Sequence, residues 1–179
     1  MMIENVKQEV KKLLNKDNSG HGMNHINRVL NLSLRFAKKE KANIEIVTLI
    51  ALLHDVDDYK LFGMESAKRL TNAKRIMDDC NVERDIQEQV CHALNNIGYS
   101  KKLKGHCPTT IEGKIVSDAD MCDALGSNGI LRVYTYSMKN GKPFFNKKSL
   151  FKPLNKDFIK IKCCEFCRTF CRTTKFFIN

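Results

Sequence analysis

The sequence predicts an all-α protein, a helical bundle of about six to eight helices. Three observations lead to this prediction. Apolar residues recur at intervals of three and four along most of the chain, which is the spacing of one helix face. The segment 44–56 is apolar nearly all round, so it suits a central helix that other helices surround. No alternating pattern typical of a strand extends beyond a few residues.

The periodicity places the individual helices in order along the chain. Residues 17–20 separate the first two helices, and Gly141 and Pro143 end the last one. The loop 98–108 contains three lysines, and Glu112 is placed for a capping interaction at the start of the helix that follows. The expected helices span 1–14, 22–41, 44–56, 63–79, 82–97, 109 or 110–125, and 128–138.

Length and composition indicate a globular protein. A chain of 179 residues is long enough for one domain with its own core. Its 42% hydrophobic and 28% charged content is ordinary for such a domain. No apolar run approaches the roughly 18 residues that cross a bilayer, and the charged first segment does not resemble a secretory signal. We therefore expect a cytoplasmic protein that does not insert into membranes.

The positive charge is concentrated near the C-terminus. Of the net charge of +11, residues 147–179 contribute nine basic against two acidic side chains. The rest of the chain is only mildly basic, which disfavours nucleic acid as a partner. A basic helical nucleic-acid-binding protein is therefore the weaker alternative.

The eight cysteines are distributed unevenly. Four of them lie between positions 163 and 171, and without a secretory signal we expect reduced thiols. The Cys164-x-x-Cys167 pair would suit one half of a zinc site, but no second pair or histidine follows at a suitable distance. We do not favour a structural zinc ion there.

Two histidines lie where a polar side chain needs a partner. His25 shares one helical stripe with Val29, and such a residue on its own is more often a hydrogen-bonded core histidine. His54-Asp55 follows directly on the most apolar helix. A buried carboxylate has to be paired or bound to a metal, although a helix end that emerges into solvent is the simpler interpretation of this doublet alone.

A third polar group interrupts a later apolar helix. Asp118, Asp120 and Asp123 fall within six residues, either as an outward acidic edge or as oxygen ligands. Histidine nitrogen with carboxylate oxygen, without thiolate, suits Mn²⁺, Fe²⁺, Co²⁺, Ni²⁺ or Zn²⁺. Ligands from three separate helices can converge in the core of a bundle. The three groups together therefore predict a metal site.

These residues resemble the signature of the HD-domain superfamily of metal-dependent phosphohydrolases. The family pattern is a histidine, a later His-Asp doublet and a distant aspartate, and in this chain it reads His25, His54-Asp55 and Asp120. The resemblance implies that these four residues bind the metal. Helical periodicity instead turns Asp118 inward, so Asp118 is the alternative to Asp120. We expect Mn²⁺ first, with Mg²⁺, Fe²⁺, Co²⁺, Ni²⁺ or Zn²⁺ as alternatives.

The resemblance extends through longer segments and covers about residues 2–150. Residues 20–29 are similar to the Gly-His-Asp-x-x-His-x-x-Arg-Val segment of the family, with Gly22 in place of the aspartate. Residues 51–60 and 112–126 are similar to the segments around the His-Asp doublet and the last aspartate of small stand-alone bacterial members. We therefore expect an HD phosphohydrolase domain over residues 1–150.

The resemblance also suggests residues that act on a substrate. Asp58 is the candidate general base or supporting carboxylate, and Lys60 the candidate phosphate contact, although a solvated helix end explains both equally well. His21 and Arg28 would face substrate oxygens, and His92 would orient the leaving group. The metal would lower the pKa of a water molecule and polarise a phosphoryl oxygen.

Residue chemistry limits the substrate to a phosphate ester or anhydride, and the resemblance implies a nucleotide. The alternative within the same fold is a catalytically inactive module that binds a nucleotide or a metal. The protein would be a monomer or a homodimer. Residues 151–179 depart from the family, and we interpret this basic, cysteine-rich tail as drifted or out of frame, with a poorly specified closing helix.

Overall fold

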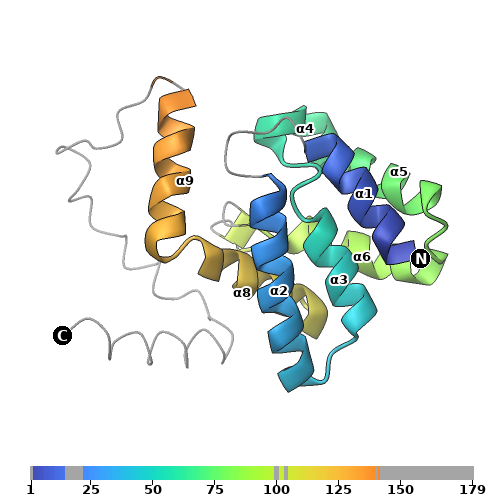
Figure 1. Ribbon diagram of the computed structural model, residues 1–179. Helices are drawn as coiled ribbons and strands as arrows, with labels where there is room; N and C mark the ends of the chain where they lie inside the picture. Colours follow the sequence, from blue (N-terminus) through green and yellow to red (C-terminus); the bar gives the residue numbers. More distant parts are fainter. Residues whose placement is uncertain (1, 15–21, 99–100, 103–104, 140, 142–179) are drawn as a thin grey trace.

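The computed structural model describes residues 2–14, 22–98, 101–102, 105–139 and 141. Over these ranges the chain forms α-helices without strands, which confirms the all-α prediction. The helices form one bundle from which the last helix extends (Figure 1). They are α1 (Met2–Leu14), α2 (Met23–Glu40), α3 (Ile44–Leu53), α4 (Tyr59–Arg69), α5 (Thr71–Asp79), α6 (Arg84–Asn96), α8 (Ile111–Asp123) and α9 (Gly126–Lys139).

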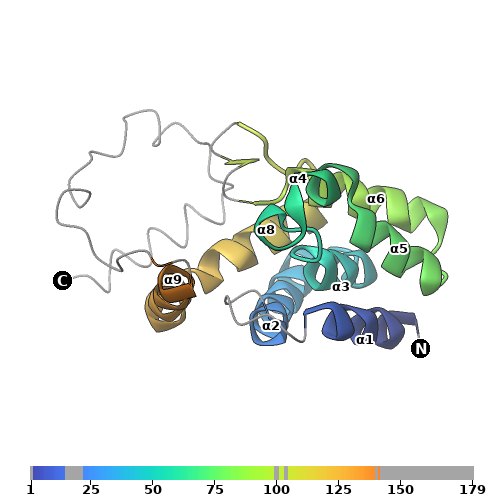
Figure 2. The same ribbon diagram turned by 90° about the horizontal axis from the view of Figure 1, so that it is seen from above.

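Helix α3 is the centre of the bundle. Every residue from Ile46 to Leu53 is buried, because α1, α2, α6 and α8 all pack against this helix (Figures 1 and 2). The Asn43 side chain begins α3 by accepting hydrogen bonds from the backbone N–H groups of Glu45 and Ile46, at 3.0 and 3.2 Å. The prediction of a central helix in the apolar segment 44–56 is therefore confirmed, with the helix itself spanning Ile44–Leu53.

Helices α2 and α8 pack on α3 and on each other. The buried face of α2 carries Ile26, Val29 and Ala37, and that of α8 carries Ile115, Val116 and Ala119. Because α2, α3 and α8 contact one another in all three pairings, polar residues on their inner faces or at their ends can meet at one point.

The segment predicted as one helix over 63–79 is two helices, so that prediction was wrong. Helix α4 ends at Arg69, the following Leu70 has a left-handed backbone (φ 53), and α5 starts at the next residue. The buried Asp57 carboxylate accepts the backbone N–H groups of Asn72 and Ala73, both at 2.9 Å, and so satisfies two of the free donors in the first turn of α5. The apolar periodicity continues across this break and does not reveal it.

The end of α3 and the capping of α8 also differ from the prediction. Helix α3 ends at Leu53 rather than Val56, so the His-Asp doublet lies in the turn that follows. Glu112 does not cap α8: Thr110 Oγ1 accepts the N–H of Gly113 at 3.2 Å, while Glu112 Oε1 accepts the backbone N–H of Asn43 at 3.2 Å. Glu112 therefore joins the first turn of α8 to the start of α3.

Helix α9 follows α8 in the chain and lies apart from the other helices of the bundle (Figures 1 and 2). Its apolar side chains Leu131, Tyr134 and Met138 are exposed. Among the described residues, the structure has no helix of the length and apolarity that spanning a membrane requires. His21, Lys104 and the cysteine-rich tail lie outside the described residues, so the interpretation of the tail stays a prediction.

Candidate metal centre

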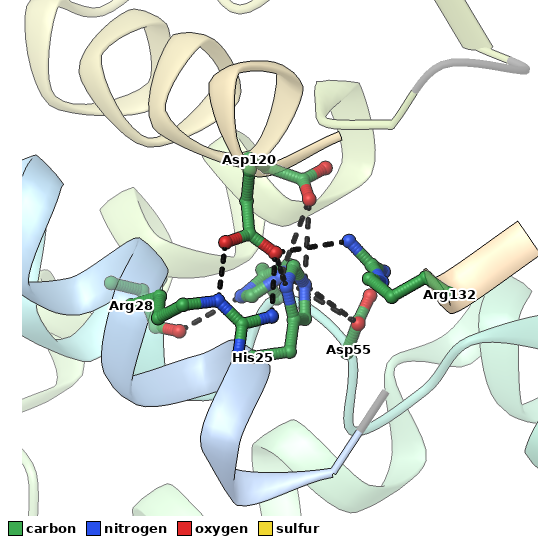
Figure 3. Close-up of polar contacts among 8 residues, drawn as sticks. His25, Arg28, Asp55, Asp120 and Arg132 are labelled. Atoms are coloured by element: carbon green, nitrogen blue, oxygen red, sulfur yellow. Dashed lines mark hydrogen bonds and ion pairs between the residues drawn. The ribbon is translucent and has the colours of Figure 1, made fainter. Parts of the chain in front are cut away.

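Four donor atoms from three helices meet at one point of the bundle, and we call this set the donor cluster (Figure 3). It consists of His25 from α2, His54 and Asp55 directly after α3, and Asp120 from α8. His25 Nε2 lies 3.1 Å from His54 Nε2, 3.3 Å from Asp55 Oδ2 and 3.4 Å from Asp120 Oδ1. His54 Nε2 lies 3.7 Å from Asp55 Oδ2 and 3.9 Å from Asp120 Oδ1.

These separations fit a divalent cation. Nitrogen and oxygen ligands about 2.1 Å from one ion lie about 3.0 Å apart in octahedral and about 3.4 Å apart in tetrahedral coordination. The donor atoms of His25, His54 and Asp120 all lie within 4.8 Å of one another, close enough for one ion to bind all three. Two imidazoles and two carboxylates are the ligand types of divalent first-row transition metals.

The hydrogen bonds of both imidazoles direct their Nε2 atoms at the cluster. His54 Nδ1 lies 2.8 Å from the carbonyl oxygen of Ala51, which can only accept, so the proton is on Nδ1. His25 Nδ1 lies 2.8 Å from Asp123 Oδ2 and donates to this carboxylate. Each Nε2 is therefore available as a ligand, in the arrangement that orients metal-binding histidines.

Asp123 has a role in the site that the sequence interpretation missed. Its side chain is 5% exposed, and besides His25 it accepts Arg28 Nε at 2.6 Å, Arg28 Nη2 at 2.9 Å and Arg132 Nη1 at 3.2 Å. Burial favours the neutral carboxyl, but the bonds from His25 and Arg28 outweigh burial and hold the pKa of Asp123 well below its usual range. The spacing of Asp120 and Asp123, three residues apart on one helix face, is the signal that points to it.

The carboxylates favour positive charge at the centre of the cluster. Burial opposes a charged imidazole, but hydrogen bonds with Asp120, Asp123 and Asp55 raise the pKa of His25 to about 10. The same three carboxylates favour a bound cation for the same electrostatic reason.

The structure places the remaining candidate residues in different surroundings. Asp118 is buried, as periodicity predicted, but Asp120 is the α8 residue that joins the two histidines. Asp58 begins α4 by accepting the backbone N–H of Lys60 at 2.8 Å, and the Lys60 side chain is exposed, with Nζ 5.8 Å from the ring centroid of Tyr59. His92 is also exposed, and its Nε2 lies 2.8 Å from Thr109 Oγ1.

An all-helical bundle with a half-buried histidine–aspartate cluster defines a class of metal-binding helical proteins. Within this class, residues 22–125 match the family model described as HD domain, and the chain belongs to the HD-domain family. A curated relative is the uncharacterized protein YpgQ of Bacillus subtilis (strain 168), which is 32% identical in a 142-residue alignment that covers 77% of this chain and 67% of the relative. The family and the cluster together support a metal-dependent hydrolase in general.

Solved structures show the same fold. A crystal structure of a Lactobacillus plantarum protein has a TM-score of 0.73 and 32% identity, covering 82% of this chain and 67% of that one. A Bacillus thuringiensis protein described as an HD-superfamily hydrolase has a TM-score of 0.60 and 32% identity, covering 82% and 70%. The crystal structure of B. subtilis YpgQ in complex with ADP has a TM-score of 0.63 and 28% identity, covering 82% and 71%.

Proposed function

We propose that this protein is a metal-dependent phosphohydrolase that acts on a nucleotide, cleaving a phosphate ester or anhydride. The observation that carries the proposal is the convergence of the donor cluster beside a partly exposed arginine, Arg28, whose side chain is 37% exposed. A half-buried cation site next to a guanidinium suits a phosphate, which is anionic and binds both. The ADP bound to the relative YpgQ supports a nucleotide as the substrate class.

The donor cluster would hold the metal through His25, His54, Asp55 and Asp120, and Mn²⁺ is our first choice among the divalent ions. A divalent ion bound there would lower the pKa of a water molecule and would polarise a phosphoryl oxygen. Asp123 keeps His25 in the tautomer that presents Nε2, and the Ala51 carbonyl does the same for His54.

The other side chains of the site would bind substrate or move protons. Arg28 would contact a phosphate oxygen, because its guanidinium lies at the edge of the cluster and is partly open to solvent. Asp58 caps α4 through Oδ1, and this carboxylate, three residues after the His-Asp doublet, remains our candidate for the general base. Lys60 and His92, both exposed, and His21 remain proposed substrate contacts.

The test is a hydrolysis assay on the full chain after metal removal and reloading with Mn²⁺. Phosphate and pyrophosphate release would be measured with a panel of nucleoside mono-, di- and triphosphates. We expect release that His54→Ala and Asp120→Ala both abolish, with at least a ~1,000-fold loss because the metal is no longer held. Asp118→Asn is the matched control, since it alters another carboxylate of α8, and it should retain metal and activity.

The assay also separates the alternatives. Release that survives both ligand substitutions would come from a contaminant. One tightly bound metal per chain without release from any nucleotide would identify an inactive binding module. Loss of metal in Asp118→Asn, but not in Asp120→Ala, would show that the ligand on α8 is Asp118. A chain that binds no divalent metal would disprove the proposal.

A further inference from the structure

One carboxylate beside the donor cluster is shared by two arginines that are paired very differently. Arg28 contacts Asp123 through two donors, Nε at 2.6 Å and Nη2 at 2.9 Å. Arg132 of α9 contacts the same carboxylate through one donor, Nη1, at 3.2 Å. The Arg28 pair has the geometry of a planar fork matched to a carboxylate, and the Arg132 pair does not.

Arg132 shares a single oxygen of Asp123 with two stronger donors. Asp123 Oδ2 accepts from His25 Nδ1 at 2.8 Å and Arg28 Nη2 at 2.9 Å as well as from Arg132 Nη1 at 3.2 Å, and these three donors exceed its two lone pairs. A guanidinium has five N–H donors. Within the described part of the chain, the contact with Asp123 is the hydrogen bond that the Arg132 guanidinium makes. Its side chain is 21% exposed, so its other donors are open to a ligand.

The charge balance of the site also favours an anion. The network of ion pairs contains three carboxylates and two guanidiniums around two imidazoles. If both imidazoles are neutral and one divalent cation is bound, the charges of the three carboxylates, the two guanidiniums and the cation sum to +1. A metal-loaded site would therefore carry a net positive charge, which favours an anionic ligand beside Arg132.

The position of Arg132 fits a contact with a ligand at the metal. Figure 3 shows Arg28 and Arg132 approaching the cluster from different sides, Arg28 from α2 and Arg132 from α9. Asp123 joins both of them to His25, a residue of the donor cluster. A phosphate chain bound at the cluster would therefore be within reach of a guanidinium on either side.

We propose that Arg132 is a substrate-binding residue that donates to a phosphate group of the nucleotide beside the metal. This inference rests on the proposed function, and it adds a residue and a helix that the sequence motifs do not include. In this arrangement, the phosphate oxygens accept hydrogen bonds from the Arg132 N–H groups that do not contact Asp123. The competing interpretation is that Arg132 only attaches α9 to α8 through Asp123.

The experiment measures two affinities of the full-length protein. Mn²⁺ binding is followed by calorimetry, and imidodiphosphate, a pyrophosphate analogue with a bridging nitrogen, is then titrated into the Mn²⁺-loaded protein. Arg132→Met should weaken imidodiphosphate binding by roughly 10- to 100-fold, and Arg132→Lys should weaken it less. Mn²⁺ should bind to Arg132→Met as tightly as to the wild type or more tightly, because a nearby positive charge is gone.

The matched control removes a guanidinium elsewhere. The Arg84 side chain is 81% exposed, and its Nη1 lies 3.5 Å from Asp78 Oδ1. Arg84→Met should change neither the Mn²⁺ affinity nor the imidodiphosphate affinity. An imidodiphosphate affinity of Arg132→Met equal to that of the wild type would overturn the inference. A parallel loss of Mn²⁺ and imidodiphosphate binding would also overturn it, because it would show that Arg132 only attaches α9. Absence of imidodiphosphate binding to the wild type would have the same consequence.

Failure of this inference is distinguishable from failure of the proposed function. If the wild type hydrolyses nucleotides and Arg132→Met has the same KM, the function stands and the role of Arg132 is overturned. If no nucleotide is hydrolysed but imidodiphosphate binding still depends on Arg132, the function fails and the anion site stands.

Discussion

Asp57 and Asp123 are both buried carboxylates, yet they are held by different kinds of donor. Asp57 accepts the backbone N–H groups of Asn72 and Ala73 and the hydroxyl of Ser66. Asp123 accepts His25, Arg28 and Arg132. Burial shows that each carboxylate must be satisfied, but only the donors show its purpose: backbone groups indicate architecture, and basic side chains beside a metal site indicate chemistry.

The largest effect on stability is expected at Asp57. Asp57→Ala should lower the free energy of unfolding by about 3 kcal/mol, because it leaves two backbone donors and a hydroxyl without their acceptor. The Mn²⁺ affinity of the folded protein should stay unchanged. Urea denaturation and calorimetry would measure the two quantities. The control is Asp79→Ala, which removes an exposed pair with Arg75 and should cost less than about 0.5 kcal/mol.

Asp123→Asn should show the opposite pattern. The Mn²⁺ affinity should fall by about 10- to 100-fold, because the residue that orients His25 loses its charge. The loss of unfolding free energy should be smaller than in Asp57→Ala, since asparagine keeps the shape and can still accept a hydrogen bond. Equal Mn²⁺ affinities of the variant and the wild type would remove the distinction between the two carboxylates.

The metal-free protein should lose stability as the pH rises. The pKa of His25 is raised from 6.5 to about 10 in the fold, so its contribution is complete below pH 6.5 and is lost as the pH rises toward 10. Each pH unit in this window lowers the free energy of unfolding by up to about 1.4 kcal/mol. Asp123→Asn should flatten this dependence because it removes one of the carboxylates around His25. Urea denaturation at several pH values measures how the free energy of unfolding depends on pH. If this dependence were the same for Asp123→Asn and the wild type, the carboxylate of Asp123 would not be a cause of the raised pKa of His25.

The smallest effect is expected at the start of α3. Asn43→Ala removes an exposed side chain that caps two backbone N–H groups, and it should cost about 1 kcal/mol. Water replaces the lost acceptor at this exposed position, whereas it cannot at Asp57. Mn²⁺ affinity should not change. A destabilisation as large as that of Asp57→Ala would show that exposure does not distinguish the two caps.

Several features could be predicted because they depend on local spacing. The all-α class and the central α3 follow from the period of the apolar residues. Gathering His25, His54, Asp55 and Asp120 required the pattern of a known family as well, since each residue alone has an ordinary structural explanation. The structure brings these four donors together, as that pattern implied.

Other features depend on contacts between segments that are distant in the sequence. The break between α4 and α5 depends on the Asp57 carboxylate, which lies outside both helices. On α8, periodicity favoured Asp118 and the family pattern favoured Asp120, and only the packing of α2 and α3 decides which carboxylate lies beside the histidines.

The sequence by itself therefore determined the helical class, the central helix and the ligand types, because these follow from periodicity and side-chain chemistry. Only the tertiary structure decided that Asp123 orients His25 and that Arg132 of α9 reaches the same carboxylate. Asp123 is 98 positions from His25, and hydrogen bonds act over about 3 Å. Such a partnership exists only where the fold places both side chains.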